Sequence, residues 1–168
     1  LKPNLFKITK YNKKKGEIMT TESTLVLIKP DGVNRGLIGD IISRLESTGL
    51  KISGLKLIQI DNELAGKHYQ EHKEKPFFGS LIEFITSSPV VAIVISGPDA
   101  IKKTRTTMGV TNPLESAPGT IRGDFGLTVE KNIIHGSANI DDAKREISLY
   151  FNDDEIINYP RSIDNWIE

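Results

Sequence analysis

The sequence predicts one domain of the α/β (α+β) class, in which helices cover a mostly antiparallel sheet in a split β-α-β order. Short apolar runs rich in β-branched residues alternate with segments whose apolar residues recur at helical spacing, which predicts alternating strands and helices. The 168 residues are enough for one compact core and too few for two domains of ordinary size.

The first half of the chain is predicted to begin the sheet. Residues 24–28 form an apolar run that suits a buried central strand, and the sequence KPDG at 29–32 is a turn signal. Isoleucines and a leucine at helical spacing predict a helix over residues 38–45. Residues 51–60 are the second strand candidate, where Gly54 indicates a bulge or a close backbone approach.

The alternation continues in the second half. A helix capped by Asp61 or Asn62 is followed by a short helix over residues 81–85, a buried strand over 90–95 and a helix that Pro98 opens. Next comes a long loop over residues 107–124, then a short extended piece over residues 133–135 and a final helix over residues 139–151. A loop of that length in a small domain is unusual and is often functional.

Charge divides the chain into two parts. Its formal net charge is zero, but residues 1–18 carry six lysines and one glutamate, so the rest is acidic. We predict that residues 1–18 are a disordered basic leader or an added extension, with weak signs of organellar targeting, and that residues 19–168 are the functional domain. The acidic body argues against a nucleic-acid surface.

Composition excludes several classes of protein. The chain has no cysteine, which excludes disulfides, a thiol nucleophile and thiolate metal sites. No apolar run approaches about 18 residues, so we expect no membrane span. A cytoplasmic location is a separate expectation.

The residues that can carry chemistry point to phosphate. Lys29 ends a buried strand, and Arg105 and Arg122 flank or lie within the long loop, which also holds Thr111. Two guanidiniums, one ammonium and a hydroxyl in one cleft would suit a polyphosphate. Taken singly, each of these cations is more often a solvated or paired surface charge.

His135 is the candidate nucleophile. A neutral imidazole can attack phosphorus, and Gly136 leaves room beside the ring. Glu146 on the following helix can orient the imidazole, and Phe77 can offer a face on which a base stacks. The competing interpretations are a structural histidine, a solvated glutamate and a core phenylalanine.

The motifs together resemble those of nucleoside diphosphate kinases. The matching segments are TLVLIKPDGVNRGLIGDII at 24–42, HYQEHKEKPFFGSLIEFI at 68–85, SPVVAIVISG at 88–97, TRTTMGVTNPLESAPGTIRGDFG at 104–126, NIIHGS at 132–137 and NWIE at 165–168. The resemblance implies a ferredoxin-like fold with a four-stranded sheet. It also implies ping-pong transfer of the γ-phosphoryl group of a nucleoside triphosphate, usually ATP, to a nucleoside diphosphate.

The resemblance also assigns roles to residues. His135 matches the phosphorylated histidine, and Tyr69 and Glu146 match residues around it. Lys29 and Asn132 match contacts to sugar hydroxyls, and Lys29 also reaches phosphate. The base would lie between Phe77 and Val129, and the remaining matches to the nucleotide pocket are His68, Leu81, Arg105, Thr111 and Arg122.

Three further expectations come from the resemblance. Mg²⁺ would be held mainly through the nucleotide phosphates, because the sequence contains no dedicated carboxylate cage. The chain would form a homo-oligomer, a hexamer built from dimers. Ala138 stands where the family usually has an acidic residue, and the tail lacks a tyrosine. The alternative functions are a nucleotide-binding scaffold or regulatory protein with little turnover, and weak nucleic-acid binding through the basic leader.

Overall fold

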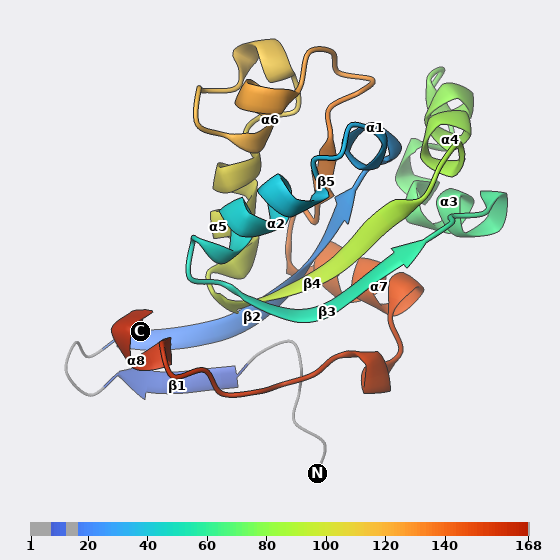
Figure 1. Ribbon diagram of the computed structural model, residues 1–168. Coiled ribbons are helices and arrows are strands. Elements are labelled where there is room, and N and C mark those ends of the chain that lie inside the picture. Colours follow the sequence, from blue (N-terminus) through green and yellow to red (C-terminus); the bar gives the residue numbers. More distant parts are fainter. Residues whose placement is uncertain (1–7, 13–16, 168) are drawn as a thin grey trace.

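The computed structural model of the protein describes residues 8–12 and 17–167, and its centre is an antiparallel sheet (Figure 1). The strands are β1 (Ile8–Asn12), β2 (Glu17–Ile28), β3 (Lys51–Ile58), β4 (Val90–Pro98) and β5 (Ile134–Gly136). Their order is β1-β2-β4-β3, and β5 also pairs with β2. The four strands β5-β2-β4-β3 have the predicted ferredoxin-like arrangement, in which the first and third strands of the split motif are central.

Helices cover both faces of this sheet. The α-helices are α1 (Pro30–Asn34), α2 (Ile38–Glu46), α3 (Asn62–His68), α4 (Phe78–Thr86), α5 (Ala100–Met108), α6 (Ile121–Phe125), α7 (Ile140–Tyr150) and α8 (Asp164–Ile167). Three short 3₁₀ turns lie at Gln70–His72, Pro113–Glu115 and Asp153–Glu155. None of the helices within the described residues is long and apolar enough to cross a membrane.

The alternation of side chains along β2 and β4 divides the core into two layers. Val26 and Ile28 face a cluster that α2, α5 and α6 complete, whereas Leu25 and Leu27 face a cluster with α3, α4 and α7. Every residue of β4 from 90 to 96 is buried, as the continuous apolar run predicted. The central strands are therefore covered on both faces.

The beginning of the chain differs from the prediction of a disordered leader over residues 1–18. Residues of β1 pair with the start of β2, from Ile8 opposite Thr21 to Asn12 opposite Glu17. On this side of β2, β5 occupies only Val26–Ile28, so the first half of β2 has a free edge that β1 fills. Residues 1–7 and 13–16 lie outside the described part, and a leader separate from the domain stays a prediction.

Two predicted turns contain helices. The KPDG signal opens α1, because Pro30 has the backbone angle that a first helical residue needs. The predicted loop over 107–124 contains a 3₁₀ turn and the start of α6, which Thr120 caps by accepting a hydrogen bond from the Gly123 amide. The bulge expected at Gly54 is confirmed by a register shift between β3 and β4 there.

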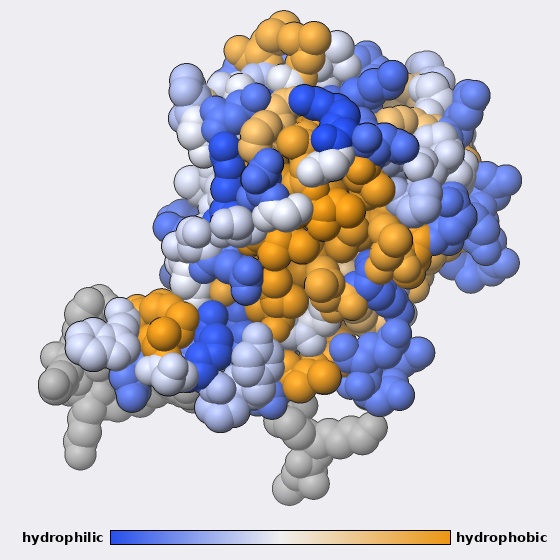
Figure 2. Space-filling model, in the orientation of Figure 1, coloured by the Kyte–Doolittle hydropathy of each residue, from blue (hydrophilic) through white to orange (hydrophobic). Residues whose placement is uncertain are grey.

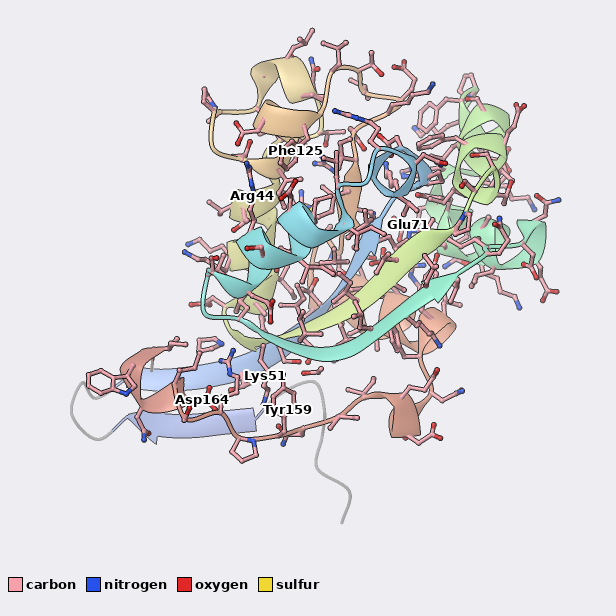
Figure 3. All side chains as sticks on the ribbon, viewed as in Figure 1. Arg44, Lys51, Glu71, Phe125, Tyr159 and Asp164 are labelled. Atoms are coloured by element: carbon pink, nitrogen blue, oxygen red, sulfur yellow. The ribbon has the colours of Figure 1, made fainter. Side chains whose placement is uncertain are left out.

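The last residues of the chain run along the β3 end of the sheet. The Ile157 amide donates to the Ser53 carbonyl, and the Lys51 ammonium lies over the Tyr159 ring (Figure 3). Arg161 pairs with Asp164 at 2.8 Å at the start of α8. The tail is thus fixed to the domain by several polar contacts.

Candidate functional site

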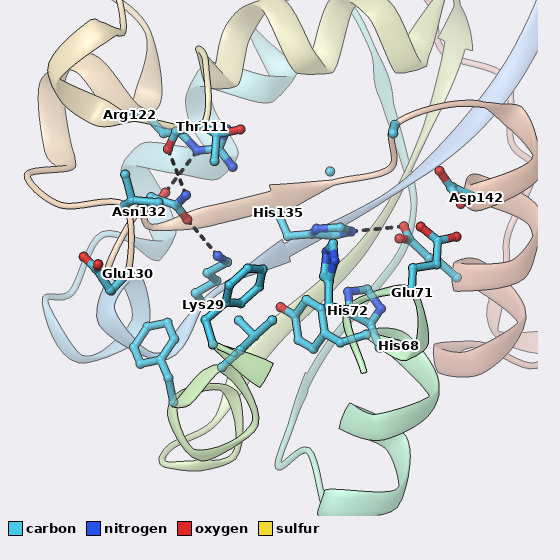
Figure 4. A pocket seen from close by; sticks show the side chains of 18 of the residues that line it. Lys29, His68, Glu71, His72, Thr111, Arg122, Glu130, Asn132, His135 and Asp142 are labelled. Atoms are coloured by element: carbon cyan, nitrogen blue, oxygen red, sulfur yellow. Dashed lines mark hydrogen bonds and ion pairs between the residues drawn. The ribbon is translucent and has the colours of Figure 1, made fainter. Parts of the chain in front are cut away.

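The predicted site residues meet in one pocket of about 650 Å³, bounded by the ends of β2 and β5, the long loop, and α3, α4 and α7 (Figure 4). All of them line it: Lys29, His68, Tyr69, Phe77, Leu81, Arg105, Thr111, Arg122, Val129, Asn132, His135 and Glu146. They come from segments spread between residues 29 and 146, so the sheet topology assembles the pocket.

Lys29 lies at the inner end of the pocket. It follows the last residue of β2, and its amide donates to the Ile133 carbonyl at 2.8 Å. Its ammonium is buried and donates to Asn132 Oδ1 at 2.7 Å. Burial, followed by the charge of Arg122, lowers the pKa of Lys29 to about 8. A negatively charged ligand would offset both the desolvation of the ammonium and its repulsion by Arg122.

The turn before β5 has an unusual backbone. Ile133 has a φ of 72°, a left-handed conformation that costs energy for a β-branched residue. Asp31 holds this turn, because its Oδ2 accepts from the Ile133 amide at 2.9 Å, and the Ile133 side chain is fully buried. The turn separates Asn132, which points toward Lys29, from His135 on the next strand (Figure 4). Sequence reasoning predicted neither the turn nor the role of Asp31.

Two arginines stand beside this turn. Arg122 is buried and donates to three backbone carbonyls, those of Gly109, Asn132 and Ile134, which fixes its guanidinium against the loop and β5. Burial, followed by the charge of Arg105, lowers the pKa of Arg122 to about 10. Lys29, Arg105 and Arg122 therefore concentrate positive charge on one wall of the pocket.

His135 is oriented by a carboxylate. Its Nε2 lies 3.1 Å from Glu146 Oε2, and the Ser137 hydroxyl donates to the same oxygen at 2.6 Å. Burial disfavours the charged form of Glu146, but the hydrogen bonds and the nearby histidines outweigh it and lower the pKa of Glu146 to about 2. Glu146 is thus an acceptor, and the ring donates through Nε2–H. In a neutral imidazole the lone pair is then on Nδ1.

Aromatic rings pack behind the nucleophile candidate. The His68 ring meets the His135 ring edge to face, with centroids 4.6 Å apart, and also contacts Tyr69 and Tyr150. His68 is only 3% exposed, and burial, followed by the charge of His135, lowers its pKa well below the usual value. Burial also raises the pKa of Tyr69. His68 lies at the floor of the pocket, so its contact with a nucleotide stays a prediction.

Comparison with known proteins agrees with this geometry. A family model described as nucleoside diphosphate kinase matches residues 22–156. A nucleoside diphosphate kinase of Archaeoglobus fulgidus is 56% identical over 146 residues, which cover 87% of this chain and 97% of the relative. The enzyme of Natronomonas pharaonis is 58% identical over 148 residues, with coverage of 88% and 97%.

The chain belongs to the nucleoside diphosphate kinase family.

Two solved structures of nucleoside diphosphate kinases share the fold. The Halobacterium salinarum kinase, solved in complex with CDP, is similar with a TM-score of 0.85 and 52% identity, covering 88% of this chain and 98% of that one. The Babesia bovis family protein also has a TM-score of 0.85, at 46% identity, covering 88% and 99%. The protein is therefore an enzyme, a nucleotide kinase, and ping-pong transfer through a phosphohistidine is general for nucleoside diphosphate kinases.

Several pocket residues of this nucleoside diphosphate kinase escaped sequence reasoning. His72 lines the pocket, with its ring centroid 5.7 Å from that of Phe77. It lies in the segment HYQEHKEKPFF between His68 and Phe77, which were both assigned to the site, and this position is the signal that could have found it. Arg145 also lines the pocket and donates to the His68 carbonyl at 3.3 Å, which links α7 to α3. Ala138, which the sequence already singled out as a departure from the family pattern, is exposed at the pocket.

Proposed function

We propose that Nδ1 of His135 carries the phosphoryl group between a nucleoside triphosphate and a nucleoside diphosphate. The observation that supports this role is the hydrogen bond between Nε2 and Glu146, because it leaves the nucleophilic lone pair on Nδ1. That lone pair forms a bond to the γ-phosphorus while the bond to the β-phosphate oxygen breaks. The diphosphate leaves with the electron pair on this oxygen.

The second half of the reaction reverses the first. A terminal oxygen of the acceptor diphosphate attacks the phosphorus on His135, and the N–P bond breaks. Glu146 keeps the ring in the same tautomer and stabilises the positive charge that the imidazole ring gains when Nδ1 forms its bond to phosphorus. Because one site serves both nucleotides in turn, the histidine divides one transfer into two equivalent steps.

Lys29, Arg105 and Arg122 are the proposed phosphate contacts, together with Thr111 on the loop beside them. Their positive charge stabilises the charge on the phosphoryl oxygens in the transition state. The left-handed turn at Ile133 holds Asn132 beside Lys29, where the two side chains can share contacts to the sugar hydroxyls. The side chains are fixed before a ligand arrives, which reduces the reorganisation needed during the reaction.

Phe77 and Val129 are the proposed contacts of the base. Both are apolar residues that line the pocket, yet they are 51% and 46% exposed. Leu81 lies one helical turn beyond Phe77 on the same wall. A base stacked on such a surface is recognised by its face, which every nucleotide offers. This arrangement fits an enzyme that accepts many bases.

Nucleotide kinases generally need a divalent cation, and Mg²⁺ is the ion that we propose here. The carboxylate closest to His135, Glu146, is buried and accepts two hydrogen bonds on one of its oxygens, and the potential metal ligands beside it are imidazole nitrogens, not the oxygen ligands that Mg²⁺ prefers. Mg²⁺ keeps much of its water and binds phosphate oxygens readily. The residues therefore suit an ion that arrives on the nucleotide and offsets the charge of its phosphates.

A labelling experiment tests the role of His135. The purified enzyme is incubated with γ-labelled ATP and Mg²⁺ and is then chased with another nucleoside diphosphate. We expect an acid-labile, base-stable label that the chase removes, and none in His135→Ala, although that variant still binds nucleotide. His72→Asn is the matched control, because it removes another pocket histidine and must still accept the label. A stable label in His135→Ala would contradict the proposal.

The assembly and the location of the kinase stay predictions. A hexamer is supported by exposed leucines on the edge strand β3, where Leu55 and Leu57 are 51% and 62% exposed. Figure 2 shows hydrophobic side chains gathered over the middle of this face, where β3 runs in Figure 1. A cytoplasmic location is inferred from the resemblance.

A further inference from the structure

Three ligand-bearing side chains meet directly behind the reacting nitrogen. One nitrogen each of His68 and His135 and one carboxylate oxygen of Glu146 all lie within 4.8 Å of one another. A tetrahedral Zn²⁺ with ligand bonds of about 2.1 Å needs its ligands about 3.4 Å apart. The three atoms therefore need to approach one another by no more than about 1.4 Å when an ion binds.

His68 is the member of this cluster that the phosphoryl transfer leaves unexplained. Only 3% of its surface is exposed. Neither of its ring nitrogens has a hydrogen-bond partner among residues 8–12 and 17–167. Buried polar groups without partners are rare and call for a ligand or a role. The ring therefore offers a free lone pair beside the His135 ring, whose centroid lies 4.6 Å from its own.

We propose that His68, His135 and Glu146 form a binding site for a divalent transition-metal ion such as Zn²⁺, and that this ion inhibits phosphorylation of His135. Two imidazoles and one carboxylate with an open fourth position are a common ligand set for Zn²⁺. Mg²⁺ prefers oxygen ligands in octahedral geometry and does not suit this set. All three side chains line the nucleotide pocket, which gives the ion an entry path.

The inhibition follows from the tautomer of His135, and this step rests on the proposed function above. A metal ion at Nε2 replaces the proton that Nε2 now shares with Glu146. The neutral ring then carries its proton on Nδ1, which removes the lone pair that attacks phosphorus. Conversely, a phosphoryl group on Nδ1 leaves the proton on Nε2 and blocks the metal. Metal and phosphoryl group therefore exclude each other.

Metal binding can be measured without any turnover. Co²⁺ is titrated into the unphosphorylated enzyme, free of tags and nucleotide, and its visible absorption is recorded. The chain has no cysteine and only three histidines, so few other ligands compete. We expect one ion per chain, displaced by Zn²⁺ and unaffected by excess Mg²⁺. His68→Phe keeps a ring in the packing and is expected to weaken binding by about 100-fold or more. His72→Asn should bind as the parent does.

The reciprocal effect is tested on the phosphorylated enzyme. We expect the phosphorylated enzyme to lose Co²⁺ binding. We also expect buffered Zn²⁺ to slow label incorporation into the parent enzyme much more than into His68→Phe, when each rate is compared with the rate of the same protein without Zn²⁺. Binding that survives in His68→Phe, or that is lost equally in His72→Asn, would overturn the site. If the parent enzyme takes up no label even without Zn²⁺, the proposed role of His135 is refuted, whatever the Co²⁺ affinity of the parent enzyme.

Discussion

Among single residues, Glu146 couples the chemistry to the stability of the fold. It is buried, yet it remains ionised because His135 and Ser137 both donate to one of its oxygens. The same carboxylate holds the His135 ring that we propose as the nucleophile. In this proposal, the orientation of the ring and a contribution to folding depend on one carboxylate.

The stability of the enzyme should fall at acid pH in part through Glu146. Its pKa is about 2 in the folded protein, below the ordinary value of 4.5. The unfolded chain therefore binds a proton more readily between these values, and the stabilisation present above about pH 4.5 is lost as pH falls toward 2. The difference corresponds to an effect on the order of 3 kcal/mol.

Glu146→Gln tests this assignment. Urea unfolding of the parent and the variant is compared between pH 7 and pH 2.5. We expect a gap in unfolding free energy at pH 7 that narrows as the pH falls, because only the parent loses an ionised group. A gap that stays constant with pH would mean that the carboxylate charge is not what stabilises the fold.

Phe77 is expected to bind nucleotides through the face of its ring. Phe77→Ala should weaken the binding of adenine, guanine and pyrimidine nucleotides alike, by about 1–3 kcal/mol. Calorimetry with several nucleoside diphosphates measures this, and Phe77→Trp is the control that keeps an aromatic face. Weakening confined to one base would indicate recognition of base edges.

Among the elements, the short helix α6 is notable because it carries Arg122 into the pocket. The chain packs closely at the start of α6 because residue 123 is a glycine. An added Cβ there would press against the Ala117 carbonyl oxygen and the Thr120 hydroxyl. The long loop is thus packed closely onto itself, and its conformation determines where the guanidinium lies. The position of Arg122 therefore depends on the packing of the loop.

Gly123→Ala should therefore cost both stability and nucleotide binding. We expect the unfolding free energy to fall by about 1–3 kcal/mol, as overpacking usually costs, and the nucleotide affinity to fall with it. Gly66→Ala is the matched control in α3, since an added Cβ there meets no atom within 4 Å. That control should gain about 0.5–1 kcal/mol, because alanine favours a helix. Thermal unfolding and nucleotide titration distinguish the two variants, and equal effects would contradict the packing argument.

In the whole molecule, the part of the β3 edge beyond Ser53, where the C-terminal tail contacts the strand, is the most conspicuous feature. Leu55 and Leu57 are exposed there, and among the described strands β3 pairs with β4 alone. Exposed apolar side chains on an edge strand are a hazard in an isolated monomer. Burial between two copies would remove them from water, in agreement with the predicted hexamer of dimers.

The double variant Leu55→Glu with Leu57→Glu should reduce the size of the oligomer. Two buried carboxylates would oppose association, since charges are costly to bury without partners. Sedimentation velocity measures the size, and the pair Leu55→Ile with Leu57→Ile is the control that keeps the apolar area. An unchanged sedimentation coefficient in the charged variant would exclude this edge as the contact.

The local pattern of the chain determined its helices and strands and most of its site. Short apolar runs bounded by turn signals predicted β2, β3 and β4, because such runs are a property of neighbouring residues. The family motifs then named residues that do meet in one pocket. His72 was missed because its signal is its place in the segment between His68 and Phe77, whereas its immediate neighbours resemble those of a solvated histidine.

The tertiary structure alone decided how these residues act together. Lys29 meets Asn132 because β5 pairs with the end of β2, across more than a hundred positions of sequence. The left-handed turn at Ile133 exists because Asp31 and the core hold a conformation that isoleucine avoids. Likewise, only the packing of the rings buries His68, whose ring nitrogens have no hydrogen-bond partner among the described residues. Sequence periodicity records local preference, whereas charge, tautomer and burial depend on neighbours that only the folded chain brings together.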